Sequence, residues 1–182
     1  TDFVGTDGTA GGKYKDAAAL AQQIAAHWPS EQNHRYVVLT GGEPLLQLDK
    51  ALIDALHAHQ FEIALETNGT LMPPRGIDWI CVSPKSGAPL LLTEGDELKV
   101  VVPQIEQDWL LFEQMHFTHL LVQPMDGPLL QRNIELAIAH CKNRPRWRLS
   151  LHSRGYLSAF SSPQPLFSRF GCAATFRYTT RR

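Results

Sequence analysis

The sequence predicts an α/β fold with a parallel sheet, and two observations lead to that prediction. Runs of β-branched and apolar residues alternate along the chain with segments whose apolar residues recur at helical spacing. The strand-like runs end in polar residues and turn formers, which is typical of proteins built from βα units. With 182 residues, 43% of them hydrophobic and 19% charged, the chain is long enough for one domain with a hydrophobic core.

Each helix is expected where apolar residues recur at three- and four-residue spacing, and each strand where β-branched and apolar residues form a continuous run. Residues 1–14 are polar and glycine-rich without either period, so they are predicted to be a loop. Pro128 suits the first position of a helix. In chain order the expected elements are a helix at 15–28, a strand at 36–40, a helix at 45–60, strands at 61–69, 79–85 and 97–103, a helix at 107–116, a strand at 119–127, a helix at 128–143 and a strand at 146–152.

The bulk properties exclude several classes of protein. A net charge of −1 gives no long-range attraction to nucleic acid or to an anionic membrane. No apolar run approaches the roughly 18 residues that span a bilayer, and no signal-peptide pattern opens the chain, so a cytoplasmic location is expected. The cysteines Cys81, Cys141 and Cys172 are odd in number and widely separated, which argues against a disulfide framework and a CxxC metal site.

Polar residues gather at the ends of four predicted strands. Because the carboxyl ends of parallel strands share one rim of the sheet, and ligands bind there, four such ends predict a binding site. The four strand ends are Thr40–Pro44, Glu66–Thr70, Ser83–Lys85 and Gln123–Gly127.

The first of these strand ends, Gly-Gly-Glu-Pro, has a physical logic of its own. Gly41 and Gly42 lack a Cβ, so a ligand can approach their backbone closely. Glu43 places a carboxylate beside that backbone, where it suits an ammonium group, and Pro44 turns the chain away. The arrangement predicts a ligand with an amino-acid moiety; the alternative is a tight βα turn without a ligand.

The motif "LTGGEPLLQ" closely resembles the Gly-Gly-Glu-Pro strand end of radical S-adenosylmethionine enzymes. The segments "IDWICVSPK", "GDELKVV", "QPMDG" and "WRLSL" occur in the order found in 7-carboxy-7-deazaguanine synthases, and "TDFVGTDGTAGGKY" is similar to the loop after that family's cluster motif. The resemblance covers residues 1 to about 151. It implies an incomplete radical-SAM (β/α) barrel with a parallel sheet, and a homodimer for the complete family enzyme.

The resemblance also implies a reaction and its cofactors. The substrate would be 6-carboxy-5,6,7,8-tetrahydropterin, and the products 7-carboxy-7-deazaguanine, a precursor of queuosine-type bases, and ammonia. A reduced [4Fe–4S] cluster would cleave S-adenosylmethionine to a radical that takes a hydrogen atom from the substrate, Mg²⁺ would hold the substrate, and a reductant such as flavodoxin would supply the electron. No nucleic acid or membrane partner is expected.

The family's site residues transfer to this sequence only where its motifs match. Thr1 would be a magnesium ligand and Thr40 would contact the substrate. Glu66 and Asn68 would reach the ribose or substrate, or would simply cap a strand end. The residues that would bind S-adenosylmethionine are Gly42, Glu43, Ser83, Pro84, Lys85, Gln123, Pro124, Met125 and Asp126.

Two features depart from the family pattern. The three cluster cysteines would lie upstream of Thr1, so the chain is expected to be truncated and inactive as it stands, with the strand at 36–40 or its neighbour as an open sheet edge. After residue 152 the family's closing motif is altered, and Arg154 stands where a substrate-binding His is expected, which a shifted reading frame would explain. The expected organisation is a partial radical SAM core at 1–152 and an atypical basic tail at 153–182, predicted to be disordered. The alternative function is a non-catalytic barrel remnant that binds a nucleoside-like ligand or a partner subunit.

Overall fold

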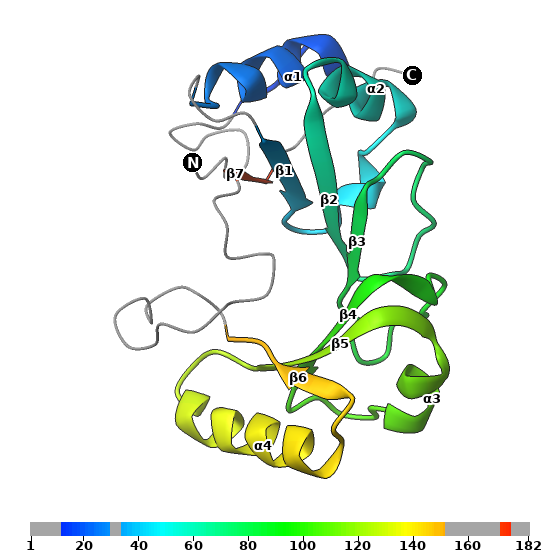
Figure 1. Cartoon of the computed structure of the whole chain (residues 1–182), viewed down its shortest axis with the longest axis vertical. Helices are drawn as coiled ribbons and strands as arrows, with labels where there is room; N and C mark the ends of the chain where they lie inside the picture. Colours follow the sequence, from blue (N-terminus) through cyan, green and yellow to red (C-terminus); the bar gives the residue numbers. More distant parts are fainter. Residues whose placement is uncertain (1–11, 30–33, 152–171, 176–182) are drawn as a thin grey trace. The chain divides into compact units, whose positions relative to one another are not determined.

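The computed structural model describes residues 12–29, 34–151 and 172–175, in which helices alternate with parallel strands (Figure 1). The described residues form two compact units. The first unit contains the residues up to Thr67, Leu71–Ile80 and the strand β7. The second contains Asn68–Thr70 and the residues from Cys81 onward to 151.

The observed elements confirm the predicted α/β class. In chain order they are α1 (Ala17–Ala26), β1 (Arg35–Thr40), the 3₁₀ helix η1 (Pro44–Leu46), α2 (Lys50–Ala58), β2 (Phe61–Thr67), β3 (Trp79–Val82), β4 (Glu94–Val102), α3 (Trp109–Gln114), β5 (His116–Pro124), α4 (Leu130–Asn143), β6 (Trp147–Leu149) and β7 (Cys172–Thr175).

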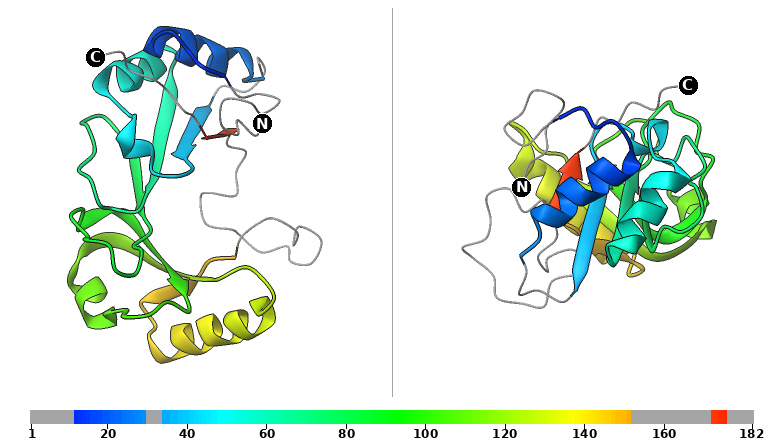
Figure 2. Two further views of the ribbon diagram at one scale, coloured as in Figure 1. Left: turned by 180° about the vertical axis from the view of Figure 1, so that it is seen from behind. Right: turned by 90° about the horizontal axis from the view of Figure 1, so that it is seen from above.

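The first unit has the strand order β7-β1-β2, with both pairings parallel. Helices α1 and α2 pack against each other and, with one face of β1 and β2, enclose a hydrophobic core (Figures 1 and 2). The helical spacing of its apolar residues explains why α1 buries one face. The buried residues of this core include Leu20, Ile24, Val37, Leu39, Ile53, Leu56, Ile63 and Leu65.

The helix predicted at 45–60 is two elements, because two carboxylates begin separate helices. The side chain of Glu43 accepts from the Leu45 N–H at the start of η1, and the side chain of Asp49 accepts from the Leu52 N–H at the start of α2. A side chain in the N-cap position satisfies a backbone donor that has no partner within the helix. The prediction of one continuous helix was therefore wrong at residues 47–49, which lie between the two.

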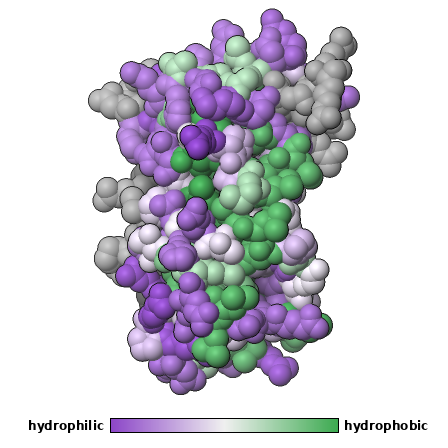
Figure 3. Space-filling model, turned by 90° about the vertical axis from the view of Figure 1, so that its right-hand side faces the viewer, coloured by the Kyte–Doolittle hydropathy of each residue, from purple (hydrophilic) through white to green (hydrophobic). Residues whose placement is uncertain are grey.

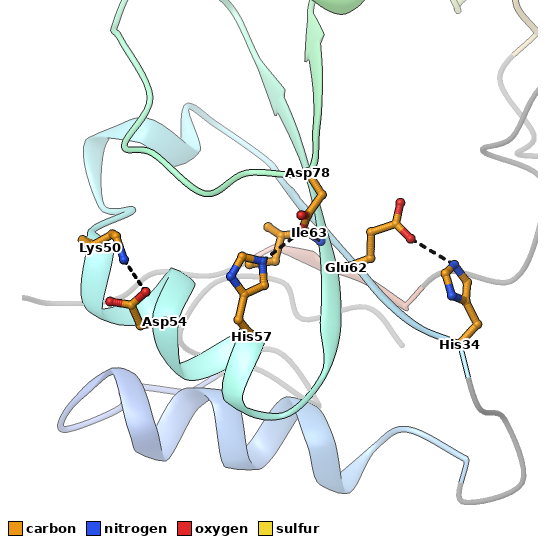
Figure 4. Close-up of polar contacts among 7 residues, drawn as sticks. All are labelled: His34, Lys50, Asp54, His57, Glu62, Ile63 and Asp78. Atoms are coloured by element: carbon orange, nitrogen blue, oxygen red, sulfur yellow. Dashed lines mark hydrogen bonds and ion pairs between the residues drawn. The ribbon is translucent and has the colours of Figure 1, made fainter.

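Asp78 ties the segment before β3 to both β2 and α2 (Figure 4). Its Oδ2 accepts from the Ile63 N–H over 2.8 Å and lies 3.0 Å from His57 Nε2, while its own N–H donates to the Ile63 carbonyl over 3.0 Å. One side chain thus joins three elements of the first unit. Two further ion pairs in the same figure, Lys50–Asp54 and His34–Glu62, lie at exposed positions.

The second unit has the strand order β3-β4-β5-β6, again parallel throughout. Strand register places Leu98 beside Leu120 and Leu120 beside Trp147, on the face that contacts α3 and α4. Because side chains alternate along a strand, Glu97 and His119 lie beside each other on the opposite face.

An aromatic cluster closes the helical side of the second unit. The ring of His140 lies against Trp109 with centroids 3.8 Å apart, and edge-on to Trp147 at 5.4 Å. Among the described residues, the buried Nε2 of His140 has no hydrogen-bond partner.

Burial lowers the pKa of His140, the nearby charge of Arg144 lowers this pKa further, and the charge of Glu113 opposes both effects. Hydrogen bonds from Arg144 and Trp147, each 2.8 Å, lower the pKa of Glu113 in turn.

The stability of the second unit is expected to fall as the pH is lowered from about 7 to about 5, the range in which an ordinary histidine titrates. The pKa of His140 is lower in the folded protein than in the unfolded chain, so between those two pKa values the unfolded state binds more protons. The free energy of unfolding therefore decreases as the pH falls through that range. His140→Phe keeps an aromatic ring against Trp109 without a titrating group, and should flatten the slope in urea unfolding.

His116→Phe is a matched control for that variant, since His116 is exposed at the start of β5 in the same unit. It should leave the slope as it is in the unsubstituted chain. An unaltered slope in His140→Phe would contradict the assignment of the pH dependence to His140.

Strand β7 lies within the segment predicted to have no element of its own. Its residues Cys172–Thr175 pair with Val37–Thr40 of β1. The expectation of an open edge at 36–40 itself was therefore wrong, and its neighbour β7 is the last strand of the sheet among the described residues. "FGCAATFRY" has no sustained period, and the described part of it is a strand of only four residues, which is why the pattern did not reveal it. The rest of the predicted tail lies outside the described residues.

In the part of the chain that the structure describes, no helix is long and apolar enough to cross a membrane. Large apolar side chains nevertheless reach the surface, among them Ile105 with 77% and Leu110 with 63% exposure. On the face that Figure 3 views, apolar side chains gather in several groups that are flanked by polar ones. Isolated exposed apolar residues are common on proteins and do not by themselves mark a site.

Candidate functional site

The ends of β1 and β2 are joined by two side-chain hydrogen bonds in the first unit. The parallel register sets Leu39 beside Leu65, so the next residues, Thr40 and Glu66, also lie side by side. Thr40 Oγ1 donates to Glu66 Oε2 over 2.8 Å. The structure thus brings together the predicted substrate-contacting threonine and the carboxylate of the neighbouring strand end.

The second bond runs the opposite way between the same two strand ends. Thr67 Oγ1 donates to Glu43 Oε1 over 2.7 Å, and the Leu45 N–H donates to the same oxygen over 3.1 Å. Thr67 is 3% exposed. Two donors on one oxygen orient the Glu43 carboxylate, which is half-buried at the strand end.

The two glycines between Thr40 and Glu43 both adopt left-handed backbone conformations. The φ angles are +89° at Gly41 and +56° at Gly42, a region that side chains other than glycine enter at a cost. A Cβ built on Gly42 would meet no atom within 4 Å. The backbone of Gly42 therefore borders open space beside the oriented carboxylate, an arrangement that fits a ligand with an ammonium group and an approaching polar chain.

In the second unit, the end of β3 leads into a turn fastened to the segment after β4. Pro84 is buried and Lys85 exposed. The Ser86 N–H donates to Gln104 Oε1 over 3.0 Å, and Ser86 Oγ donates to the Ile105 carbonyl over 2.8 Å. Strand β3 ends at Val82, so Ser83, Pro84 and Lys85 lie beyond the strand rather than in it, because proline supplies no N–H for the ladder.

The end of β5 is fixed from beneath by a residue of α4. Gln123 and Pro124 are the last residues of the strand, and Met125 and Asp126 follow it. Asn133, 5% exposed, donates through Nδ2 to the Met125 carbonyl over 2.8 Å. The Met125 N–H donates to the Val102 carbonyl over 2.7 Å, which ties this end to β4.

Thr67 and Asn133 were not singled out by the sequence, although both hold predicted site residues in place. Thr67 lay within a predicted strand end, but its partner depends on the register between two strands. Asn133 occupies a helix position where an apolar residue is expected to face the sheet. A buried asparagine in the apolar spacing of a helix is a pattern that could have identified it.

The described residues do not fit a [4Fe–4S] cluster. Such a cluster is held by cysteine thiolates, yet Cys81 is fully buried within β3 and Cys141 lies near the end of α4. No group of three or more His, Cys, Asp or Glu side chains that could hold a metal ion occurs among the described residues. Thr1, the predicted magnesium ligand, lies outside them.

Comparison with known proteins gives consistent relatives. No protein-family model matches the chain. The chain is 58% identical over 158 residues to the 7-carboxy-7-deazaguanine synthase of Burkholderia multivorans, covering 87% of this chain and 75% of that protein. It is 55% identical over 157 residues to the enzyme of the same name from Bordetella pertussis, covering 86% and 75%.

Among solved structures, the chain resembles the crystal structure of QueE from Escherichia coli with a TM-score of 0.54 and 24% identity, over 75% of this chain and 63% of that one. This likeness shows a shared fold and confirms the predicted incomplete barrel architecture. The relatives found by sequence are more similar to this chain, since both of those named above exceed half identity over most of it. On that basis, the chain belongs to the 7-carboxy-7-deazaguanine synthase family of radical S-adenosylmethionine lyases.

Proposed function

We propose that this chain belongs to the machinery that converts 6-carboxy-5,6,7,8-tetrahydropterin to 7-carboxy-7-deazaguanine and ammonia. The observation that carries the proposal is the oriented Glu43 carboxylate beside the open Gly42 backbone, in a chain whose relatives bear the name of this enzyme. S-adenosylmethionine would supply the radical chemistry, and the chain would bind and orient it.

Each group at the strand ends has a role in this proposal. The Glu43 carboxylate receives the ammonium group of S-adenosylmethionine, and the Gly42 backbone pairs with its amino-acid moiety. Thr40 contacts the substrate; because its hydroxyl donates to Glu66, it offers its oxygen lone pairs as acceptors. Thr1 would bind Mg²⁺. The other residues proposed to line the cofactor are Ser83, Pro84, Lys85, Gln123, Pro124, Met125 and Asp126.

The proposal also covers the oligomeric state, the location and the partners of the complete enzyme. The complete enzyme acts as a homodimer in the cytoplasm, with a reductant such as flavodoxin and without nucleic acid or membrane partners. The chain of 182 residues does not hold the [4Fe–4S] cluster on its own, since Cys81 and Cys141 lie on separate elements and Cys81 is fully buried. We therefore propose that it binds ligands but does not by itself catalyse the reaction.

Reconstitution of the purified chain with iron and sulfide is expected to give no cluster absorbance and no 5′-deoxyadenosine from S-adenosylmethionine. The reason is that three thiolates on one loop are required and this chain has only three separated cysteines. The Burkholderia multivorans relative, treated identically, serves as the positive control. Release of 5′-deoxyadenosine by this chain would overturn the proposed inactivity.

A binding measurement then separates the family function from the alternative of a non-catalytic remnant. In calorimetry, the chain should bind 6-carboxytetrahydropterin in the presence of Mg²⁺ and S-adenosylhomocysteine. Binding of the nucleoside compound without any binding of the pterin would favour the remnant.

A further inference from the structure

Thr67 contacts a residue of the proposed site, but none of the roles proposed above is assigned to it. It is the last residue of β2, it is 3% exposed, and its hydroxyl donates to Glu43 Oε1 over 2.7 Å. A β-branched side chain in a strand has few χ1 states, so the direction of this hydroxyl is largely fixed by the backbone. Burial keeps bulk water from competing for the bond.

The bond acts on the carboxylate rather than on any ligand. Together with the Leu45 N–H, which reaches the same oxygen over 3.1 Å, Thr67 sets the rotamer and the plane of the Glu43 carboxylate before a ligand arrives. A group that is already oriented loses less conformational entropy on binding. Only ligands that place a cationic group at Glu43 gain affinity from this orientation.

We propose that Thr67 is a positioning residue which, by orienting Glu43, makes the site prefer nucleosides with an amino-acid moiety over nucleosides without one. The inference rests on the proposed role of Glu43 as the acceptor of an ammonium group. It adds that Thr67, which lies at the end of β2 and not in the Gly-Gly-Glu-Pro motif, sets this selectivity.

A threonine away from the strand ends of the site supplies a matched control. Thr118 lies in β5, is exposed, and belongs to the second unit. Thr118→Val removes a hydroxyl of the same type from a strand but leaves the donors Thr67 and Leu45 of Glu43 in place. It should therefore leave the ligand preference unchanged.

The test compares two ligands by calorimetry on the full chain. S-adenosylhomocysteine carries the amino-acid moiety, and methylthioadenosine is the corresponding thioether nucleoside without it. Thr67→Val should weaken binding of S-adenosylhomocysteine by about 5- to 10-fold, as expected for loss of one oriented hydrogen bond, and that of methylthioadenosine by less than about twofold. Thr67→Ser, which keeps the hydroxyl, should restore the preference. In a Glu43→Gln background, Thr67→Val should cause no further loss.

Three outcomes would overturn the inference. An equal loss of affinity for both ligands would mean that Thr67 only supports the fold, and a full preference for S-adenosylhomocysteine in Thr67→Val would mean that it does not act on Glu43. If the unsubstituted chain binds both ligands equally, the proposed role of Glu43 itself fails, before any variant is made. Thr67→Cys, whose thiol fills a similar space but donates weakly, replaces the valine variant if that one does not fold.

Discussion

Glu43→Gln is expected to weaken the binding of S-adenosylhomocysteine to this chain by about 10- to 150-fold, because a hydrogen bond to a charged group contributes roughly 1.5–3 kcal/mol. Glutamine keeps an acceptor oxygen for the Leu45 N–H and for Thr67, so the substitution removes the negative charge with little change in the local hydrogen bonds. Alanine would remove the charge together with the N-cap of η1, which mixes two effects. Calorimetry at fixed ionic strength measures the change.

Glu62→Gln is a suitable control for this variant. Glu62 belongs to β2, and its carboxylate lies 3.0 Å from His34 Nε2 with 39% of its side chain exposed. It lies near the amino end of the strand, away from the strand end with Thr67, so its loss should leave ligand affinity unaltered. Undiminished affinity in Glu43→Gln would show that Gly-Gly-Glu-Pro is only a tight turn here.

The order and type of nearly all elements were predictable, because buried strands and amphipathic helices leave periodic patterns in a sequence. The boundaries were less so. Strand β4 begins at Glu94 rather than at residue 97, and β5 at His116 rather than at 119. Backbone pairing extends both strands through polar residues, since Glu94 pairs with His116 in register and hydrogen bonds of the ladder do not depend on side-chain polarity.

The candidate site likewise has a part that the sequence indicates and a part that it does not. Gly42 and Glu43 could be proposed from the sequence because their chemistry is visible in adjacent residues: a missing Cβ and a carboxylate. The bonds from Thr67 to Glu43 and from Thr40 to Glu66 join residues separated by 24 and 26 positions. Such pairs are fixed by the register of β1 against β2, which local sequence does not specify. The sequence thus predicts which polar residues lie at strand ends, but only the folded structure shows which of them are hydrogen-bonded to one another.

The glycines illustrate why the same residue type needs separate arguments. Gly42 borders open space, whereas Gly69, which follows the end of β2 and belongs to the second unit, lies against packed side chains. At the first position the proposed function requires glycine for a ligand's approach, whereas at the second the close packing of the protein itself favours glycine. The sequence alone gives both the same appearance, a glycine after a strand.

Gly69→Ala is expected to destabilise the second unit by roughly 2–5 kcal/mol, combining about 1–2 kcal/mol for a left-handed alanine with an overpacking penalty of about 1–3 kcal/mol. Its φ is +79°, and a Cβ there would lie 2.6 Å from Leu90 Cδ1 and 2.8 Å from Val82 Cγ1. Leu90 has a flexible side chain that can move aside, but Val82 is fully buried and β-branched within β3, so it has little freedom to yield. The backbone is also held, because the Gly69 carbonyl accepts from the N–H groups of Leu91 and Leu92 over 2.9 and 3.1 Å.

Gly87→Ala separates the two contributions. Gly87 has a similar φ of +74°, but a Cβ there would meet nothing within 4 Å, so only the conformational penalty of about 1–2 kcal/mol remains. Urea unfolding followed by circular dichroism should show a lower midpoint for both variants with an unchanged denaturant slope, and a clearly lower one for Gly69→Ala. Equal midpoints would mean that the region around Val82 relaxes to accept the methyl group, and that Gly69 is required for its backbone conformation alone.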